Sequence, residues 1–234
     1  MSGKIFRLDK AVLSARNNSV NFLNGISANT IDKPKNVFLD MYGKIIATFD
    51  QLKVNDDLVF VIIESKYYEP LMQHLDRYIR LSKAQVTKED YCVYYDLDNS
   101  FVRAVHEPPL LEGDIFVIPQ RVGQLIATKQ DLPNSVSDEE FTLFRLKNCL
   151  PMHGVDYQAE MILNVAEEEF VSFTKGCFLG QEPVSKVHNR SKPTWKLAVK
   201  FEDECSEEEK IKMTSQIKDP QTGKFLGFVF VSNR

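Results

Sequence analysis

The residue types with the clearest chemical potential lie together in one short segment, Lys-Gly-Cys-Phe-Leu-Gly-Gln-Glu, at positions 175–182. Gly176 and Gly180 flank the cysteine and the phenylalanine, so the backbone there can turn or approach another group closely. Lys175 lies two residues before Cys177, and a helix that begins near Gly180 would add to a positive local field. Because positive charge favours the thiolate over the thiol, the segment predicts that Cys177 is a functional thiol. A buried structural cysteine in a tight turn is the alternative.

This segment closely resembles the K-G-C-(Y/F)-x-G-Q-E signature of the YgfZ family, bacterial relatives of the mitochondrial Iba-type iron–sulfur assembly factors. It is similar, more loosely, to the K-x-x-F-x-G-x-E stretch of the glycine-cleavage T-protein, which has no cysteine there. The resemblance implies that Cys177 is a redox-sensitive thiol or a transient contact for metal or sulfur, with Lys175 as its electrostatic partner. It also implies that Phe178 and Cys177 lie near a central cavity, and that Gln181 and Glu182 orient the loop through hydrogen bonds. A single cysteine cannot hold an iron–sulfur cluster alone, so any such contact is shared or transient.

The resemblance covers most of residues 5–200 and implies a folate ligand. Asn29 and Thr30 take the positions that follow the first helix in both families. Lys147 stands where the T-protein has the glutamate that holds the pterin. A lysine cannot accept the pterin's N–H donors, although it could attract the glutamate tail of a folate. The candidate residues for binding tetrahydrofolate or a derivative are Asn29, Thr30, Arg145, Lys147, Lys186 and Arg190. For Lys186 and Arg190, the alternative is a solvated helix face.

For function, the resemblance implies a non-catalytic accessory factor that supports assembly or repair of iron–sulfur clusters in client enzymes, including enzymes that modify tRNA, with tetrahydrofolate as its ligand. Its partners would be those enzymes or other assembly proteins. The alternative is a folate-dependent aminomethyl transferase of the T-protein class. Ala47 and Thr48 stand where the T-protein carries carboxylates, and this transfer needs an acid to manage the proton. A third hypothesis is a cysteine-nucleophile enzyme that uses Cys177 with His188 or His153.

Composition sets broader limits. The chain has 234 residues, of which 43% are hydrophobic and 26% charged, as in globular proteins that bury a core. Its net charge of −4 argues against a general nucleic-acid or anionic-membrane binder. No run approaches the roughly 18 apolar residues of a membrane span, and we expect a cytoplasmic protein, or a mitochondrial-matrix protein if the chain is a trimmed eukaryotic form. Four cysteines without a C-x-x-C pair predict reduced thiols and no metal site, with Cys92 and Cys149 in the core.

Hydrophobic periodicity predicts an α+β layered fold. Helices are predicted after Ser19 as a cap, from Tyr67 to Ile79, and from Ser137, also as a cap, to Cys149. The family resemblance implies ferredoxin-like modules of the T-protein and YgfZ type: a folate-binding-type region of two interleaved modules over residues 1–192, and a reduced C-terminal β-barrel-like domain over residues 193–234. Strands are predicted at 5–8, 37–40, 44–49, 58–63, 85–87, 92–95, 101–106, 114–118, 124–128, 195–201, 215–218 and 227–231.

Overall fold

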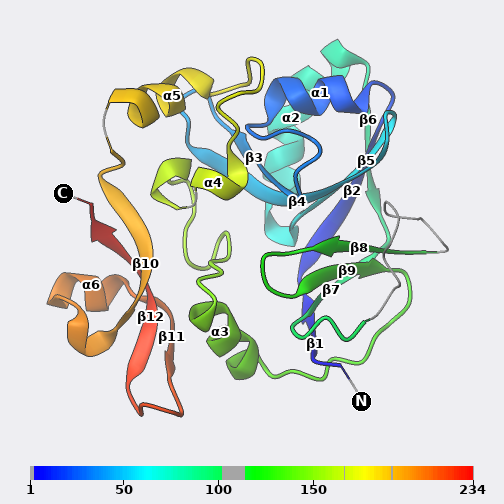
Figure 1. Cartoon of the computed structure of the whole chain (residues 1–234). Coiled ribbons are helices and arrows are strands. Elements are labelled where there is room, and N and C mark those ends of the chain that lie inside the picture. The colour runs from blue at the N-terminus through cyan, green and yellow to red at the C-terminus, as the bar shows by residue number, and fades with distance from the viewer. Residues whose placement is uncertain (1–2, 102–113, 166, 191, 234) are drawn as a thin grey trace.

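A computed structural model of the chain describes residues 3–101, 114–165, 167–190 and 192–233, and arranges their strands in three sheets (Figure 1). The five-stranded sheet has the order β3 (Lys35–Leu39), β4 (Ile45–Asn55), β5 (Leu58–Glu64), β2 (Lys10–Arg16) and β6 (Gln85–Glu89). The four-stranded sheet has the order β1 (Ile5–Leu8), β7 (Cys92–Asp96), β9 (Gln124–Thr128) and β8 (Ile115–Pro119). The three-stranded sheet has the order β10 (Trp195–Phe201), β12 (Phe225–Ser232) and β11 (Thr214–Lys218). The helices are α1 (Ser19–Ile26), α2 (Tyr68–Ser82), α3 (Asp138–Lys147), α4 (Glu167–Phe170), α5 (Gln181–Arg190) and α6 (Glu207–Lys212).

Helices α1 and α2 cover one face of the five-stranded sheet (Figure 1). Leu71 and Leu75 of α2, four residues apart, are buried against that face and confirm the helix predicted there. The start of α1 differs from the prediction. Asn18, in the left-handed region with φ 62°, is the residue before the helix and makes no side-chain cap. The hydroxyl of Ser19 is buried in the first turn without a partner among the described residues, so Ser19 is not the cap.

The opposite face of the five-stranded sheet packs on the four-stranded sheet. The rings of Phe60 on β5 and Phe116 on β8 stack with their centroids 4.6 Å apart. Helix α3 closes this core, because its Phe141 ring stacks on Phe6 of β1 at 4.1 Å. As predicted, Ser137 caps α3: its side chain accepts a hydrogen bond from the main-chain nitrogen of Glu140 at 3.2 Å.

Strand β2, between β5 and β6, is a strand that periodicity missed. Its residues face two different cores: Leu13 and Ala15 pack toward α1 and α2, whereas Val12 packs toward the four-stranded sheet. A strand buried on both faces does not alternate between apolar and polar residues, and alanine is not a strong strand former. The other predicted strands within the described residues are present, those at 5–8, 124–128 and 195–201 with the predicted bounds and the rest with shifted ends. All but the first residue of the strand predicted at 101–106 lies outside the described residues.

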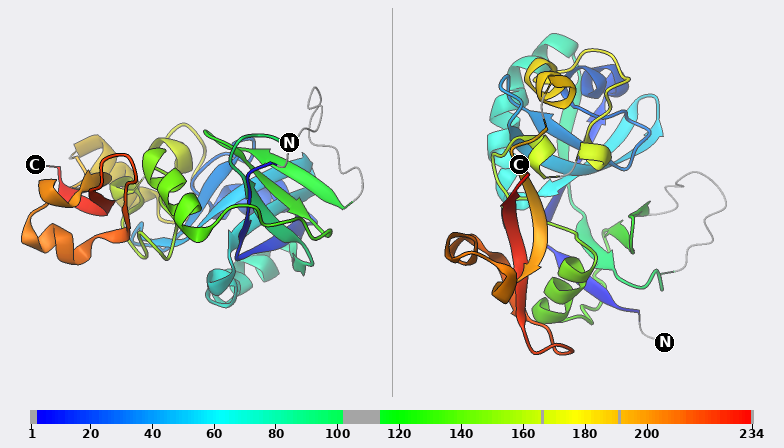
Figure 2. Two further views of the ribbon diagram at one scale, coloured as in Figure 1. Left: turned by 90° about the horizontal axis from the view of Figure 1, so that it is seen from below. Right: turned by 60° about the vertical axis from the view of Figure 1, so that its left-hand side comes forward.

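The C-terminal strands form an open antiparallel sheet with α6 beside it, at the end of the molecule away from α1 and α2 (Figure 2). A barrel must close on itself, and the three described strands leave two edges, so the barrel-like piece is not confirmed. Leu197 and Phe228 of this sheet share a core with Leu146 of α3 and Val184 of α5. The boundary after residue 192 stays a prediction.

The end of α3 corrects the placement of Cys149 in the core. Cys149 is exposed and has φ 51°, in the left-handed region that favours glycine. Its main-chain nitrogen donates to Leu146, and that of Leu150 donates to Arg145, which is the hydrogen-bond pattern of a Schellman helix end. Because the chain turns at this helix end, the side chain of Cys149 points into solvent. Cys92 is half-buried.

Candidate functional site

The cysteine segment forms an exposed loop that is tied to the end of α1. The Nζ atom of Lys175 donates hydrogen bonds to the carbonyl oxygens of Ser27 and Asn29, at 2.7 and 2.9 Å, and lies 5.4 Å from the centroid of the Phe178 ring. Burial lowers the pKa of Lys175 to about 8. Cys177 is exposed. The lysine therefore holds the loop through carbonyls, and its role as an electrostatic partner of the thiol stays a prediction.

Gly180 fixes the other end of the loop. Its φ is +80°, and a Cβ atom there would collide with the carbonyl oxygen of Asp40. Phe178 is buried in the core that underlies α5, and α5 begins immediately after Gly180, as predicted. Gln181 is half-buried and Glu182 exposed in its first turn. The loop thus presents its thiol outward between two fixed points.

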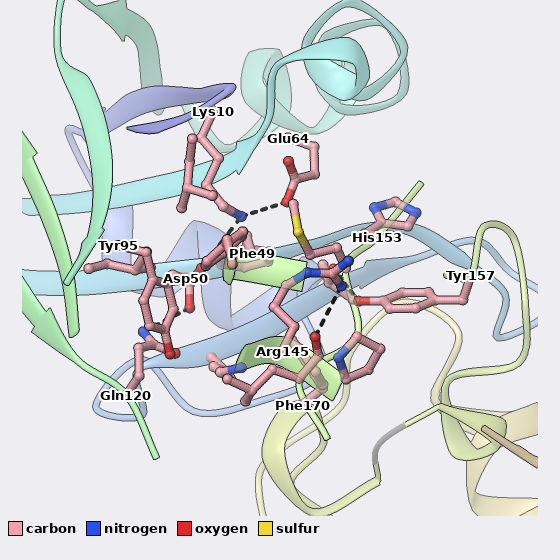
Figure 3. A pocket seen from close by; sticks show the side chains of 18 residues that line it. Lys10, Phe49, Asp50, Glu64, Tyr95, Gln120, Arg145, His153, Tyr157 and Phe170 are labelled. Carbon is pink, nitrogen blue, oxygen red and sulfur yellow. Dashed lines mark hydrogen bonds and ion pairs between the residues drawn. The ribbon is translucent and has the colours of Figure 1, made fainter. Parts of the chain in front are cut away.

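A second feature is a cavity of about 80 Å³ between the five-stranded sheet and the segment that follows α3 (Figure 3). Lys10 of β2 lies in it, with its Nζ atom 2.7 Å from Glu64 and 3.9 Å from Asp50. Burial alone would lower the pKa of Lys10, but the two carboxylates outweigh it and raise the pKa. Gln120 donates a hydrogen bond to Asp50 at 3.1 Å. The cavity therefore contains two carboxylates held by one buried cation and an amide.

Two buried polar atoms in the cavity lining have no hydrogen-bond partner among the described residues: Nε of Arg145 and Nδ1 of His153. The His153 ring stacks on Tyr67 with centroids 3.9 Å apart. Burial, helped by the charges of Lys10 and Lys66, lowers the pKa of His153 to about 3, so the imidazole is neutral at physiological pH. Because unsatisfied buried polar groups are costly, these atoms point to a bound molecule or water in the cavity.

Ala47 and Thr48, the two positions on β4 where the T-protein carries carboxylates, lie on opposite faces of the strand. The hydroxyl of Thr48 lies in the cavity and forms a 2.8 Å hydrogen bond with the hydroxyl of Tyr157. Ala47 points to the other face, into the core with α1 and α2. Asp50, two residues after Thr48 and on the same face, supplies the cavity with a carboxylate. Sequence analysis missed Lys10, Asp50 and Glu64, although a charged residue within or at the end of an apolar strand was the available signal.

The predicted folate residues lie at different places. The amide of Asn29 is fully engaged: it donates to the carbonyls of Lys35 and Glu169 and accepts from the main-chain nitrogen of Thr30. Arg145 lines the cavity. Lys147 is 40% exposed, lies 3.5 Å from Asp219, and is absent from the described lining. Lys186 and Arg190 are exposed on α5 and are likewise outside that lining. The charged and titratable residues of the lining include Lys10, Lys35, Asp50, Glu64, Arg145 and His153.

A wide groove of about 850 Å³ lies beside the cavity, between the start of β3, the β8–β9 turn and the segment after α4. Lys35 and Gln120 line both the cavity and the groove. Thr30 lines both the groove and the surface hollow that contains Lys175 and Cys177. The groove therefore adjoins the cavity on one side and the hollow around Cys177 on the other.

The histidines of the nucleophile hypothesis do not line the described hollow around Cys177. His153 faces the cavity, and the His188 ring stacks on Phe173 with centroids 3.7 Å apart. Within the described ranges, no group of three His, Cys, Asp or Glu side chains could hold a metal ion. No helix in the part of the chain that the structure describes is long and apolar enough to cross a membrane.

The arrangement matches a known structure. Over 97% of this chain and 78% of the other, it superposes on the glycine cleavage system aminomethyltransferase T from Bartonella henselae, with a TM-score of 0.77 and 12% sequence identity. The chain has the T-protein fold. This match confirms the α+β architecture implied by the family resemblance.

Sequence comparison gives a second finding. The chain is 29% identical over 159 residues to a Dictyostelium discoideum protein named as the mitochondrial iron-sulfur cluster assembly factor IBA57 homolog. The match covers 56% of this chain and 38% of that protein, so the chain spans well under two thirds of the relative's length. No family model matches the sequence.

Proposed function

We propose that this protein is an accessory factor that supports the assembly or repair of iron–sulfur clusters in client enzymes. The exposed thiol of Cys177 carries the proposal, because Lys175 and Gly180 hold its loop at both ends and leave the sulfur accessible. Similarity to the IBA57 homolog supports it, since that protein is named for cluster assembly. A lone thiol offers a transient or shared contact, in keeping with a factor that acts on other proteins.

The proposal extends to the finer features that the family resemblance implies. The clients include enzymes that modify tRNA, the partners are those enzymes or other assembly proteins, and the protein works in the cytoplasm or the mitochondrial matrix. The motif residues Gly176, Gln181 and Glu182 shape the loop around Cys177. The region over residues 1–192 carries the ligand site, and residues 193–234 form the C-terminal domain.

Complementation tests the role of the thiol. A strain that lacks its own factor of this type should regain the activity of a four-iron enzyme with the wild-type chain but not with Cys177→Ala. Cys149→Ala, which removes another exposed thiol, is the matched control and should rescue. Both variants should unfold at nearly the wild-type temperature. Full rescue by Cys177→Ala would contradict the proposal, and a loss of more than about 2 kcal/mol of stability would instead favour a structural cysteine.

We further propose that the cavity binds the pterin head of a tetrahydrofolate. Asp50 and Glu64 provide oxygens that accept from the pterin's N–H donors, the role that Lys147 cannot fill. The partnerless Nε–H of Arg145 provides a donor for a ring carbonyl. At about 80 Å³ the cavity holds only part of a folate, since whole-ligand sites span roughly 300–1,000 Å³. When bound, tetrahydrofolate supplies a carrier for one-carbon units.

Calorimetry with tetrahydrofolate tests this ligand. We expect the wild type to bind, and Asp50→Asn to bind about tenfold more weakly, because a charged acceptor is lost. Absence of binding by the wild type would reject the folate part and leave the thiol loop as the carrier of function. An aminomethyl transferase is the second candidate, favoured by the fold and by the carboxylate of Asp50. We expect no turnover of a methylamine-type donor with tetrahydrofolate, and measurable turnover would favour the transferase.

A further inference from the structure

The groove beside the cavity contains a carboxylate that bridges two cations from different elements. The Oε2 atom of Glu169, in α4, lies 3.1 Å from Nζ of Lys35 at the start of β3. Its Oε1 atom lies 3.5 Å from Nε of Arg121 in the β8–β9 turn. All three residues line the groove, and Lys35 also lines the cavity. A carboxylate can therefore occupy this position while the rest of a molecule reaches into the cavity.

Both cations also have contacts that do not involve the Glu169 side chain. Arg121 donates from Nη2 to the carbonyl oxygens of Asn148 and Cys149 at the end of α3, at 2.5 and 3.3 Å. Lys35 lies over the ring of Phe170, with Nζ 5.4 Å from the centroid. Two cations anchored independently of the carboxylate between them form a preorganised anion site.

Glu169 can leave this site at little cost. Its side chain is 35% exposed and that of Arg121 is 53% exposed, and ion pairs with such access to water contribute little to stability. The main chain at Glu169 is held separately, since its carbonyl oxygen accepts a 3.0 Å hydrogen bond from the amide of Asn29. Rotation of the side chain alone is enough to free Lys35 and Arg121.

We propose that Lys35 and Arg121 bind the carboxylate tail of an extended ligand, and that Glu169 occupies this site as an internal competitor until the ligand displaces it. The inference rests on the proposed folate function for the identity of the head group. It assigns the tail to the groove instead of to Lys186 and Arg190, which lie on α5 away from the described groove lining. The ligand class is a planar head joined to a glutamate-type carboxylate.

A fragment of the ligand tests the groove without the cavity. Binding of p-aminobenzoyl-glutamate and of 4-aminobenzamide, which lacks the carboxylates, is followed by NMR titration at millimolar concentration. Glu169→Gln should bind p-aminobenzoyl-glutamate about two- to fivefold more tightly than the wild type, because the competitor is gone. Arg121→Gln should bind it more weakly, and neither variant should change binding of 4-aminobenzamide.

Asp32→Asn is the matched control, because it removes the same charge from the groove lining but not the bridging carboxylate. It should leave the affinity for p-aminobenzoyl-glutamate close to that of the wild type. The proposal is overturned if p-aminobenzoyl-glutamate binds none of the variants, if Glu169→Gln gains no more than Asp32→Asn, or if 4-aminobenzamide responds equally. Tail-fragment binding with the expected pattern but no binding of whole tetrahydrofolate would instead reject the pterin assignment of the cavity and leave the groove site standing.

Discussion

Arg145 and Asp156 form a buried ion pair that joins the cavity to the C-terminal sheet. The Nη1 atom of Arg145 lies 2.6 Å from Oδ2 of Asp156. The other carboxylate oxygen accepts hydrogen bonds from Ser215 and Thr214 of β11, at 2.5 and 2.9 Å. Arg145 also donates to Ser215 at 2.8 Å. One charged residue of the cavity wall is thus positioned by contacts that reach across the molecule.

Breaking this pair should destabilise the protein strongly. Asp156→Leu leaves the guanidinium of Arg145 buried without a counter-charge, and we expect a loss of about 3–5 kcal/mol in unfolding free energy from urea titration. Removing both partners, with Arg145→Met as well, should restore much of that loss. Asp203→Ala, which breaks an exposed pair with Lys224, is the control and should leave the urea midpoint nearly unchanged. A similar loss of stability in Asp156→Leu and in Asp203→Ala would contradict the structural role of Asp156.

Cys149→Gly should stabilise the protein slightly. The left-handed conformation at φ 51° costs a residue with a Cβ about 1 kcal/mol, whereas glycine adopts it freely but loses more entropy on folding, so we expect a net gain of about 0.5 kcal/mol. The measurement is the thermal midpoint. Cys149→Ala keeps the Cβ atom and should give no gain. Equal gains in the two variants would show that the thiol, and not the backbone conformation, is the source.

Stability should depend on Lys175 in alkaline solution. The pKa of its amine is about 8 in the folded protein, against an ordinary value of 10.5. Between these values the unfolded chain binds more protons than the folded one, so the contribution of Lys175 to stability rises with pH. The difference in unfolding free energy between wild type and Lys175→Met, taken as wild type minus variant, should therefore increase from pH 7 to pH 9.5. A constant difference would mean that the amine keeps its ordinary pKa.

Lys147→Glu should not create a pterin site. The substitution restores the T-protein residue type, but the side chain lies beside Asp219 and outside the described cavity lining. We expect tetrahydrofolate affinity by calorimetry to match that of the wild type, and the melting temperature to fall slightly because two carboxylates then face each other. Lys147→Gln removes the positive charge without adding a negative one, so its smaller effect isolates the repulsion. Tighter folate binding by Lys147→Glu alone would place the pterin near α3 instead.

The sequence by itself determined the loop that presents the thiol. Local backbone preferences set the shape of this loop, because its two glycines and the start of the next helix are close neighbours in the chain. Gly180 has the positive φ that glycine allows, and α5 begins at Gln181. The same holds for α2 and for the cap at Ser137, because helical spacing and capping are read within a few residues.

Only the tertiary structure decided which charges meet. Lys10, Asp50 and Glu64 lie on three strands and come together because β2 inserts beside β5, a pairing that no local pattern specified. The partner of Lys175 was also decided there, since the carbonyls of Ser27 and Asn29 come from a segment about 150 positions earlier in the chain. Side-chain partners distant in sequence depend on how sheets and helices pack, and packing depends on the whole chain.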